Sequence, residues 1–151
     1  MHKAIGRTLY EFAAFPVGLA GLVGSKRAGH LQVRLSHRLL GDPVSPPAAR
    51  PSRGRVVIHS LASLPLNLVA FALVAEAWSL FVFRGFLYPV FADGHLEDSW
   101  GGPTLAGAWL VHWLLGLPLV AAVAVILVPI TRVQTRLTRR LASRSNERGQ
   151  R

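Results

Sequence analysis

Glu76 and His112 are the two side chains whose chemistry and placement could support proton exchange. Glu76 is the one carboxyl group between Val56 and Phe83, and His112 is the one ionisable side chain between Thr104 and Ile130. A charge inside an apolar run is costly, so an ionisable residue there is a functional hypothesis by default. Gly94 lies equally far along the chain from both residues. Two antiparallel helices would therefore hold them at similar depth.

A carboxyl group facing an imidazole could titrate near neutral pH and report external acidity. We therefore propose Glu76 and His112 as a candidate polar pair, provided that the rotation of the two helices brings them together. The alternative is that Glu76 extends to the outer headgroups, while His112 makes only a local polar contact.

The segment from Asp93 to Asp98 contains carboxylates and an imidazole that could hold a divalent cation. Too few of these ligands are fixed by secondary structure, so we predict no metal site and no cofactor, with a cation site as the alternative. The chain has no cysteine, which removes disulfides, thiolate metal sites and cysteine nucleophiles. It also lacks the Gly-Lys-Ser/Thr, His-Glu-x-x-His and Gly-x-Ser-x-Gly motifs. We predict that the protein is not an enzyme.

A basic stretch occurs twice, as "LQVRLSHRLL" at residues 31–40 and as "VQTRLTRRLA" at residues 133–142. On a helix, each copy places leucines at four-residue intervals on one face and arginines on another. Such helices can lie on an anionic leaflet, with the leucines in the acyl boundary and the arginines at the phosphates. The predicted lipid contacts are Arg34, Arg38, Arg132, Arg136, Arg139 and Arg140. The alternative is a solvated basic flank without a stable helix.

Two apolar blocks, Val56–Phe83 and Thr104–Ile130, must position these residues. Each exceeds the roughly 20 residues that a helix needs to cross a bilayer, so both are predicted to span one. Nine Lys or Arg residues precede the first block and seven follow the second, whereas the connection has only Arg84. The positive-inside rule then places both flanks, and the C-terminus, in the cytoplasm of a multi-pass plasma-membrane protein.

A third apolar block, Leu9–Gly24, is shorter and is interrupted by Glu11 and Pro16. It is predicted to form a membrane-associated helix that is interfacial or half-buried, with a poor span as the alternative. The four tryptophans cluster around the connection, and such rings prefer the headgroup boundary. Anchoring at the outer interface is the predicted role, and a ligand-binding aromatic box is the alternative. These residues are Trp78, Trp100, Trp109 and Trp113.

The predicted fold is all-α: a transmembrane hairpin, a short N-terminal membrane-associated helix and basic amphipathic helices on the cytoplasmic side. Residues 1–40 form the N-terminal segment, and 41–55 form a Pro-rich cytoplasmic linker. Residues 56–142 form the hairpin, with an external loop at 84–103 and a basic amphipathic helix at 131–142. Residues 143–151 are predicted to be a disordered tail. Three apolar blocks share an apolar-Pro-apolar opening, which together with the repeated basic stretch indicates a duplicated membrane module.

The segments "HLQVRLSHRLLGDPVSPP" (30–47), "LASLPLNLVAFALVAEAWSLF" (61–81), "YPVF" (88–91) and "WLLGLPLVAAVAVILVPITRVQTRLTRRLA" (113–142) carry a resemblance. They are similar to actinobacterial membrane sensor domains of the type found with histidine kinases. Two features differ from the family: the first half has one short apolar segment instead of a hairpin, and no kinase follows. The resemblance implies a truncated, stand-alone sensor domain.

We therefore expect a small non-enzymatic sensor-like or accessory module of the cell envelope. The alternative is a structural or assembly subunit of a larger membrane complex, or of a small transporter. The expected partners are a bilayer with an anionic inner leaflet and either a membrane protein or a second copy of the chain. The net charge of +10 does not indicate nucleic acid, because the positive residues flank the apolar blocks, where the inside rule already requires them.

Overall fold

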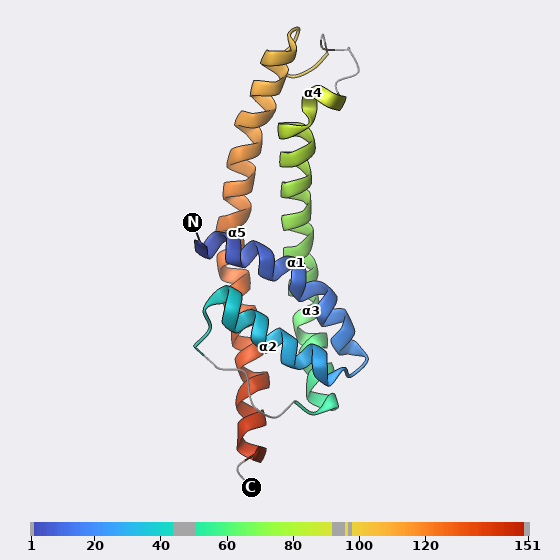
Figure 1. Ribbon diagram of the computed structural model, residues 1–151, viewed down its shortest axis with the longest axis vertical. Helices are drawn as coiled ribbons and strands as arrows, with labels where there is room; N and C mark the ends of the chain where they lie inside the picture. Colours follow the sequence, from blue (N-terminus) through green and yellow to red (C-terminus); the bar gives the residue numbers. More distant parts are fainter. Residues whose placement is uncertain (1, 44–50, 92–95, 97, 150–151) are drawn as a thin grey trace. The chain divides into compact units, whose positions relative to one another are not determined.

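The computed structural model describes residues 2–43, 51–91, 96 and 98–149. Within these ranges the chain is helical and contains no strand, which confirms the predicted all-α class (Figure 1). Its elements are α1 (His2–Leu22), α2 (Lys26–Leu40), α3 (Arg53–Ser79), the π-helix η1 (Leu80–Phe86), α4 (Tyr88–Phe91) and α5 (Leu105–Gly149). They form two compact units: unit 1 comprises residues 1–72 and 126–151, and unit 2 comprises residues 73–125.

Two helical stretches, Arg53–Phe86 and Leu105–Ser143, are long and apolar enough to cross a membrane. They contain the two blocks predicted to span. The third apolar block lies in α1, which is not among these candidate spans. Pro16 and Pro65 lie inside α1 and α3 respectively, so the prolines of the repeated opening do not end these helices.

The helices α1 and α2 form an antiparallel pair within unit 1, joined by a tight turn. Gly24 adopts a positive φ of 71°, which glycine tolerates because it has no Cβ. Ser25 then caps α2, and its side chain accepts a hydrogen bond from the Ala28 backbone N–H. Gly41 ends α2 in the left-handed conformation, φ 68°. The basic stretch of the first copy is therefore a well-delimited helix.

Small residues let α1 lie close to the first part of α3. A Cβ added at Gly18 would come within 2.9 Å of the Asn67 side-chain nitrogen, and one added at Gly21 would collide with the Ser60 hydroxyl. Ala14, one turn before Gly18, is fully buried. Small residues at four-residue spacing are typical of helices that approach closely without a hydrophobic driving force.

The last part of α5 completes unit 1. Val33 of the first copy packs with Leu141 and Ala142 of the second copy in one buried cluster. Asn67 contacts Gln134, and the cavity beside His59 is lined by Leu137 and Leu141, so α3 and α5 run antiparallel within this unit. The two copies of the repeated stretch thus belong to one packed bundle.

Unit 2 is packed mainly through aromatic rings. Phe81 and Phe86 contact Trp113 edge-on, with centroids 5.1 and 4.7 Å apart. The Trp109 indole N–H donates to the carbonyl of Gly85, which lies near the end of η1, where carbonyl groups lack partners within the helix. Tyr88 is buried and donates to the Ser99 hydroxyl at 2.9 Å.

Three predicted segments have different bounds in the structure. The predicted tail is helical through Gly149, because residues 143–148 contain no proline or glycine to stop the propagation of α5. The predicted helix at 131–142 is therefore part of α5 and not a separate element. The predicted loop at 84–103 begins with helical residues of η1 and α4, which the aromatic contacts and the Trp109 bond hold in place.

Candidate functional site

Equivalent polar residues of the two copies are buried in unit 1. The first copy buries Gln32 and Ser36, and the second buries Gln134 and Thr138 at the matching positions. Because the two residues in each copy are four positions apart, the amide and the hydroxyl lie on the same face of their helix. The leucine face predicted to lie in the acyl boundary is partly exposed: Leu31 is 44% exposed. The repeated stretch therefore faces the protein interior with its polar side.

Tyr10 and Glu11 of α1 are both fully buried and receive hydrogen bonds from these glutamines. The Gln32 side-chain amide donates to the Tyr10 hydroxyl at 2.8 Å. The Gln134 amide donates to one oxygen of the Glu11 carboxyl group at 2.9 Å. Adjacent residues of α1 are therefore engaged by different copies of the repeat.

Asn67 extends the network to α3. The Gln134 amide also donates to the Asn67 side-chain oxygen at 2.9 Å, and the Asn67 amide donates to the Ala14 carbonyl at 3.1 Å. The hydrogen bonds thus connect α1 with α2, α3 and α5. We call Tyr10, Glu11, Gln32, Asn67 and Gln134 the Glu11 cluster.

Burial changes the acid–base properties of the cluster. It raises the pKa of Glu11 from 4.5 to about 7, because a charged carboxylate loses its hydration, while the bond from Gln134 lowers the pKa only in part. Burial also raises the pKa of Tyr10, and the nearby charge of Glu11 raises it further, against hydrogen bonds from Thr138 and Gln32. Tyr10 therefore stays neutral, and Glu11 is the group that can exchange a proton near neutral pH.

Some oxygens of the Glu11 cluster are left without a donor. Three buried oxygens have no hydrogen-bond donor among the described residues: one each on Glu11, Gln32 and Gln134. An unpartnered buried acceptor is costly, and a full negative charge on one of them adds to that cost. A proton on Glu11 removes the charge and adds one O–H donor, so the geometry favours the neutral carboxyl group.

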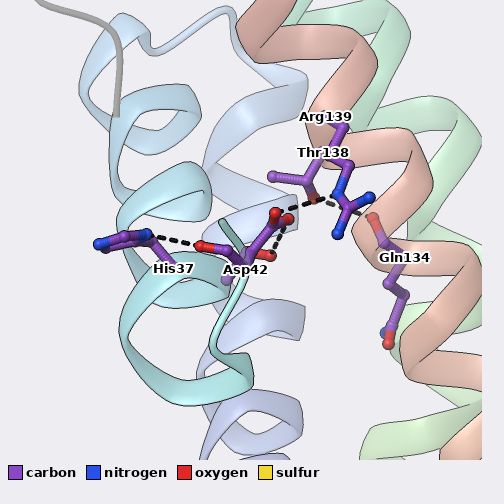
Figure 2. Close-up of polar contacts among 6 residues, drawn as sticks. His37, Asp42, Gln134, Thr138 and Arg139 are labelled. Carbon is purple, nitrogen blue, oxygen red and sulfur yellow. Dashed lines mark hydrogen bonds and ion pairs between the residues drawn. The ribbon is translucent and has the colours of Figure 1, made fainter. Parts of the chain in front are cut away.

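A charged contact lies between the two copies at the end of α2. The buried Asp42 carboxylate accepts from the Ser36 hydroxyl at 3.2 Å and from the Arg139 guanidinium at 3.0 Å. The His37 ring donates to the Asp42 backbone carbonyl at 2.7 Å. Figure 2 shows Asp42 between His37 of α2 and Arg139 of α5. This contact fixes the second copy against the left-handed turn that ends the first.

The proposed pairing of Glu76 with His112 is wrong in this structure. Glu76 is exposed, and neither an ion pair nor a hydrogen bond joins it to His112 within the described part of unit 2. The His112 ring instead donates to the Ala108 carbonyl one turn earlier, at 2.7 Å, and stacks on Tyr88 at 4.4 Å. The imidazole thus makes the local polar contact that the alternative interpretation expected.

The six arginines predicted to contact lipid are all exposed, as such a role requires. Arg38, Arg132, Arg136 and Arg139 line one cavity, but Arg34 and Arg140 do not. Of the four tryptophans, Trp78 and Trp113 join the aromatic packing of unit 2, and Trp100 is 72% exposed. Their position at a membrane interface stays a prediction. Most of the candidate cation site at 93–98 lies outside the described residues.

The Glu11 cluster was not predicted from the sequence, although three signals for it were present. Glu11 interrupts one apolar block, Asn67 lies inside another, and the two copies share a glutamine at the same position. Polar residues within apolar helices must find partners, and these three find one another. Comparisons with protein-family models, curated proteins and solved structures found no match for this chain.

Proposed function

We propose that the protein is a non-enzymatic, multi-pass membrane module of the cell envelope with a sensor-like role, and that the Glu11 cluster is its responsive element. One observation carries the proposal: a fully buried carboxyl group is held by neutral side chains in a network that connects four helical segments. A change in its charge would act on all four segments together. The resemblance of the sequence to membrane sensor domains agrees with this role.

The membrane setting is supported by the outer surfaces of α3 and α5. These helices expose large apolar side chains that water would solvate poorly, including Ile58, Leu61, Leu114 and Val125. A bilayer would cover them. The excess of Lys and Arg on both flanks supports a plasma-membrane orientation in which these flanks and the C-terminus face the cytoplasm.

Proton exchange would change the packing of unit 1. With Glu11 neutral, the cluster carries no charge and α1 stays packed against both copies. Ionisation leaves a buried anion that Gln134 alone stabilises, since the neighbouring Tyr10 is neutral and Asp42 is itself anionic. Hydration of that anion requires the helices to separate, so rising pH favours a looser arrangement of the copies.

The experiment is a distance measurement between the copies. Leu31 and Val133 occupy equivalent positions, are both exposed, and can be replaced by spin-labelled cysteines because the chain has no cysteine of its own. In lipid nanodiscs, the distance distribution should broaden or lengthen between pH 5 and pH 8, and Glu11→Gln should keep the pH 5 distribution throughout. Identical distributions at both pH values would contradict the proposal, as would the same shift in Glu11→Gln.

A structural or assembly subunit, or a part of a small transporter, is the second candidate. It is favoured by apolar side chains exposed on the short α4 and the segment after it: Val90, Phe91 and Trp100 are 74%, 60% and 72% exposed. A partner subunit could cover them. Extraction in mild detergent distinguishes the two roles, because an assembly subunit should copurify with a fixed partner in constant ratio, whereas a sensor-like module need not.

A further inference from the structure

Unit 1 contains a cavity of about 480 Å³ that is separate from the Glu11 cluster. It is bounded by the beginning of α1, the end of α2 and the part of α5 between Thr131 and Arg139. None of the five cluster residues lines it. Its volume lies within the range typical of small-molecule sites.

The cavity is strongly cationic. Six of its lining side chains are positive, and no lining residue is acidic: the cations are Lys3, Arg7, Arg38, Arg132, Arg136 and Arg139. Asp42 accepts from Arg139 at the edge, but one carboxylate cannot neutralise six cations. So many positive charges around one concave surface attract an anion and repel one another when it is absent.

The types of side chain indicate which anion fits. Guanidinium groups donate paired N–H bonds that match the oxygens of a phosphate group, and five of the six cations are arginines. The cations come from α1, α2 and α5, so they converge on a ligand from different directions. Such convergence suits a compact polyanion better than an extended surface.

The two copies of the repeat contribute unequally. The aligned pairs are Arg34 with Arg136 and Arg38 with Arg140. The cavity takes Arg38 from the first copy and Arg136 from the second, whereas Arg140 lines a different cavity beside His59. If all the arginines acted only as surface lipid contacts, the equivalent positions would contribute equally.

We propose that this cavity binds a phosphate group, carried either by an anionic lipid headgroup or by a soluble phosphate compound. The lipid source rests on the membrane setting proposed above, but the phosphate chemistry does not. No residue of the Glu11 cluster lines the site, so at pH 5, where the cluster is closed in both proteins, Glu11→Gln should bind phosphate like the parent protein. The two proposals can therefore fail separately.

The experiment compares two double variants that each remove two positive charges from the repeats. Arg38→Gln/Arg136→Gln alters the cavity, and Arg34→Gln/Arg140→Gln is the matched control. Binding of pyrophosphate to the full-length protein in phosphatidylcholine nanodiscs is measured by calorimetry. Retention of phosphatidic acid, against phosphatidylcholine, is measured by native mass spectrometry.

The cavity variant should bind pyrophosphate or phosphatidic acid, whichever the parent binds, with an affinity at least tenfold lower. The affinity of the control variant should stay within about threefold of the affinity of the parent. Binding of phosphatidic acid alone identifies a headgroup as the source, and binding of pyrophosphate identifies soluble phosphate as a ligand. Hydrogen exchange of α1 and α2 at the parent level shows that both variants are folded. Equal losses in the two variants, or no binding of either probe by the parent, would overturn the proposal.

Discussion

Replacing Glu11 by glutamine should remove a pH dependence from the stability of unit 1. Glutamine keeps an oxygen that can accept from Gln134 and, like the protonated carboxyl group, it carries no charge. In the parent protein the pKa of Glu11 is raised to about 7 in the closed cluster, and it returns to 4.5 when the cluster opens to water. The closed cluster therefore binds a proton that the open one releases between these two values.

The sign and size of the effect follow from linkage. The closed state holds more protons between pH 4.5 and about 7, so its advantage is full below pH 4.5 and is lost as the pH rises through about 7. From these pKa values, the free energy of opening should fall by about 2–3 kcal/mol between pH 5 and pH 8, roughly a 30- to 150-fold loss of amide protection. In Glu11→Gln the free energy of opening should not change with pH, and at pH 8 it should exceed that of the parent protein.

Hydrogen–deuterium exchange of the α1 amides is the appropriate assay. It reports opening of the helix that contains Glu11, whereas tryptophan fluorescence would report unit 2, which holds Trp78, Trp100, Trp109 and Trp113. Rates are divided by the intrinsic exchange rate at each pH.

Glu76→Gln is the control, because it removes an exposed carboxylate from unit 2 and should leave the α1 profile of the parent unchanged. A flat profile in the parent, or the same slope in Glu11→Gln, would refute the reasoning.

Three further predictions test the surrounding structure. Gly18→Ala should destabilise unit 1 by about 1–3 kcal/mol in an unfolding assay in detergent that is followed by circular dichroism. The reason is that the added Cβ would lie 2.9 Å from a buried amide nitrogen. Gly54→Ala is the control and should be neutral in the same assay, because a Cβ added there has nothing within 4 Å. Asp42→Asn weakens a charge-assisted contact to a half-exposed guanidinium, so exchange at the end of α2 should accelerate roughly threefold to tenfold. In intact cells, a membrane-impermeant thiol reagent should label Gly94→Cys and spare Ser143→Cys; labelling of the latter would reverse the proposed orientation.

The presence of the apolar helices could be predicted from the sequence, but their full extents and the face that α2 buries could not. Hydrophobic periodicity ranks the faces of a helix by their apolar content, so it favours burial of the face that contains Leu31. The packed face instead contains Gly29, Gln32 and Ser36, because small and hydrogen-bonding residues permit close approach to neighbouring helices. The neighbouring helices are set by the tertiary fold, and the sequence of a single helix does not identify them.

The buried carboxyl group of Glu11 was missed for a related reason. Glu76 and His112 are symmetrically placed along the chain, and that symmetry is visible without a structure. The partner of Glu11 is Gln134, 123 residues away, and its identity depends on the rotation of two helices. In the hydropathy pattern Glu11 is only an interruption of an apolar block. A charged residue in such a block nevertheless needs a polar partner.

The central claim is that Glu11 exchanges a proton near neutral pH within the folded protein. Glutamate labelled with ¹³C at the carboxyl carbon, in the full-length protein in lipid nanodiscs, reports each glutamate separately by NMR, and the signal missing from Glu11→Gln identifies this residue. That signal should titrate with a midpoint of about 7. A midpoint at or below 4.5 would contradict it, because a carboxyl group that titrates there is hydrated or ion-paired and does not lie in a buried neutral cluster.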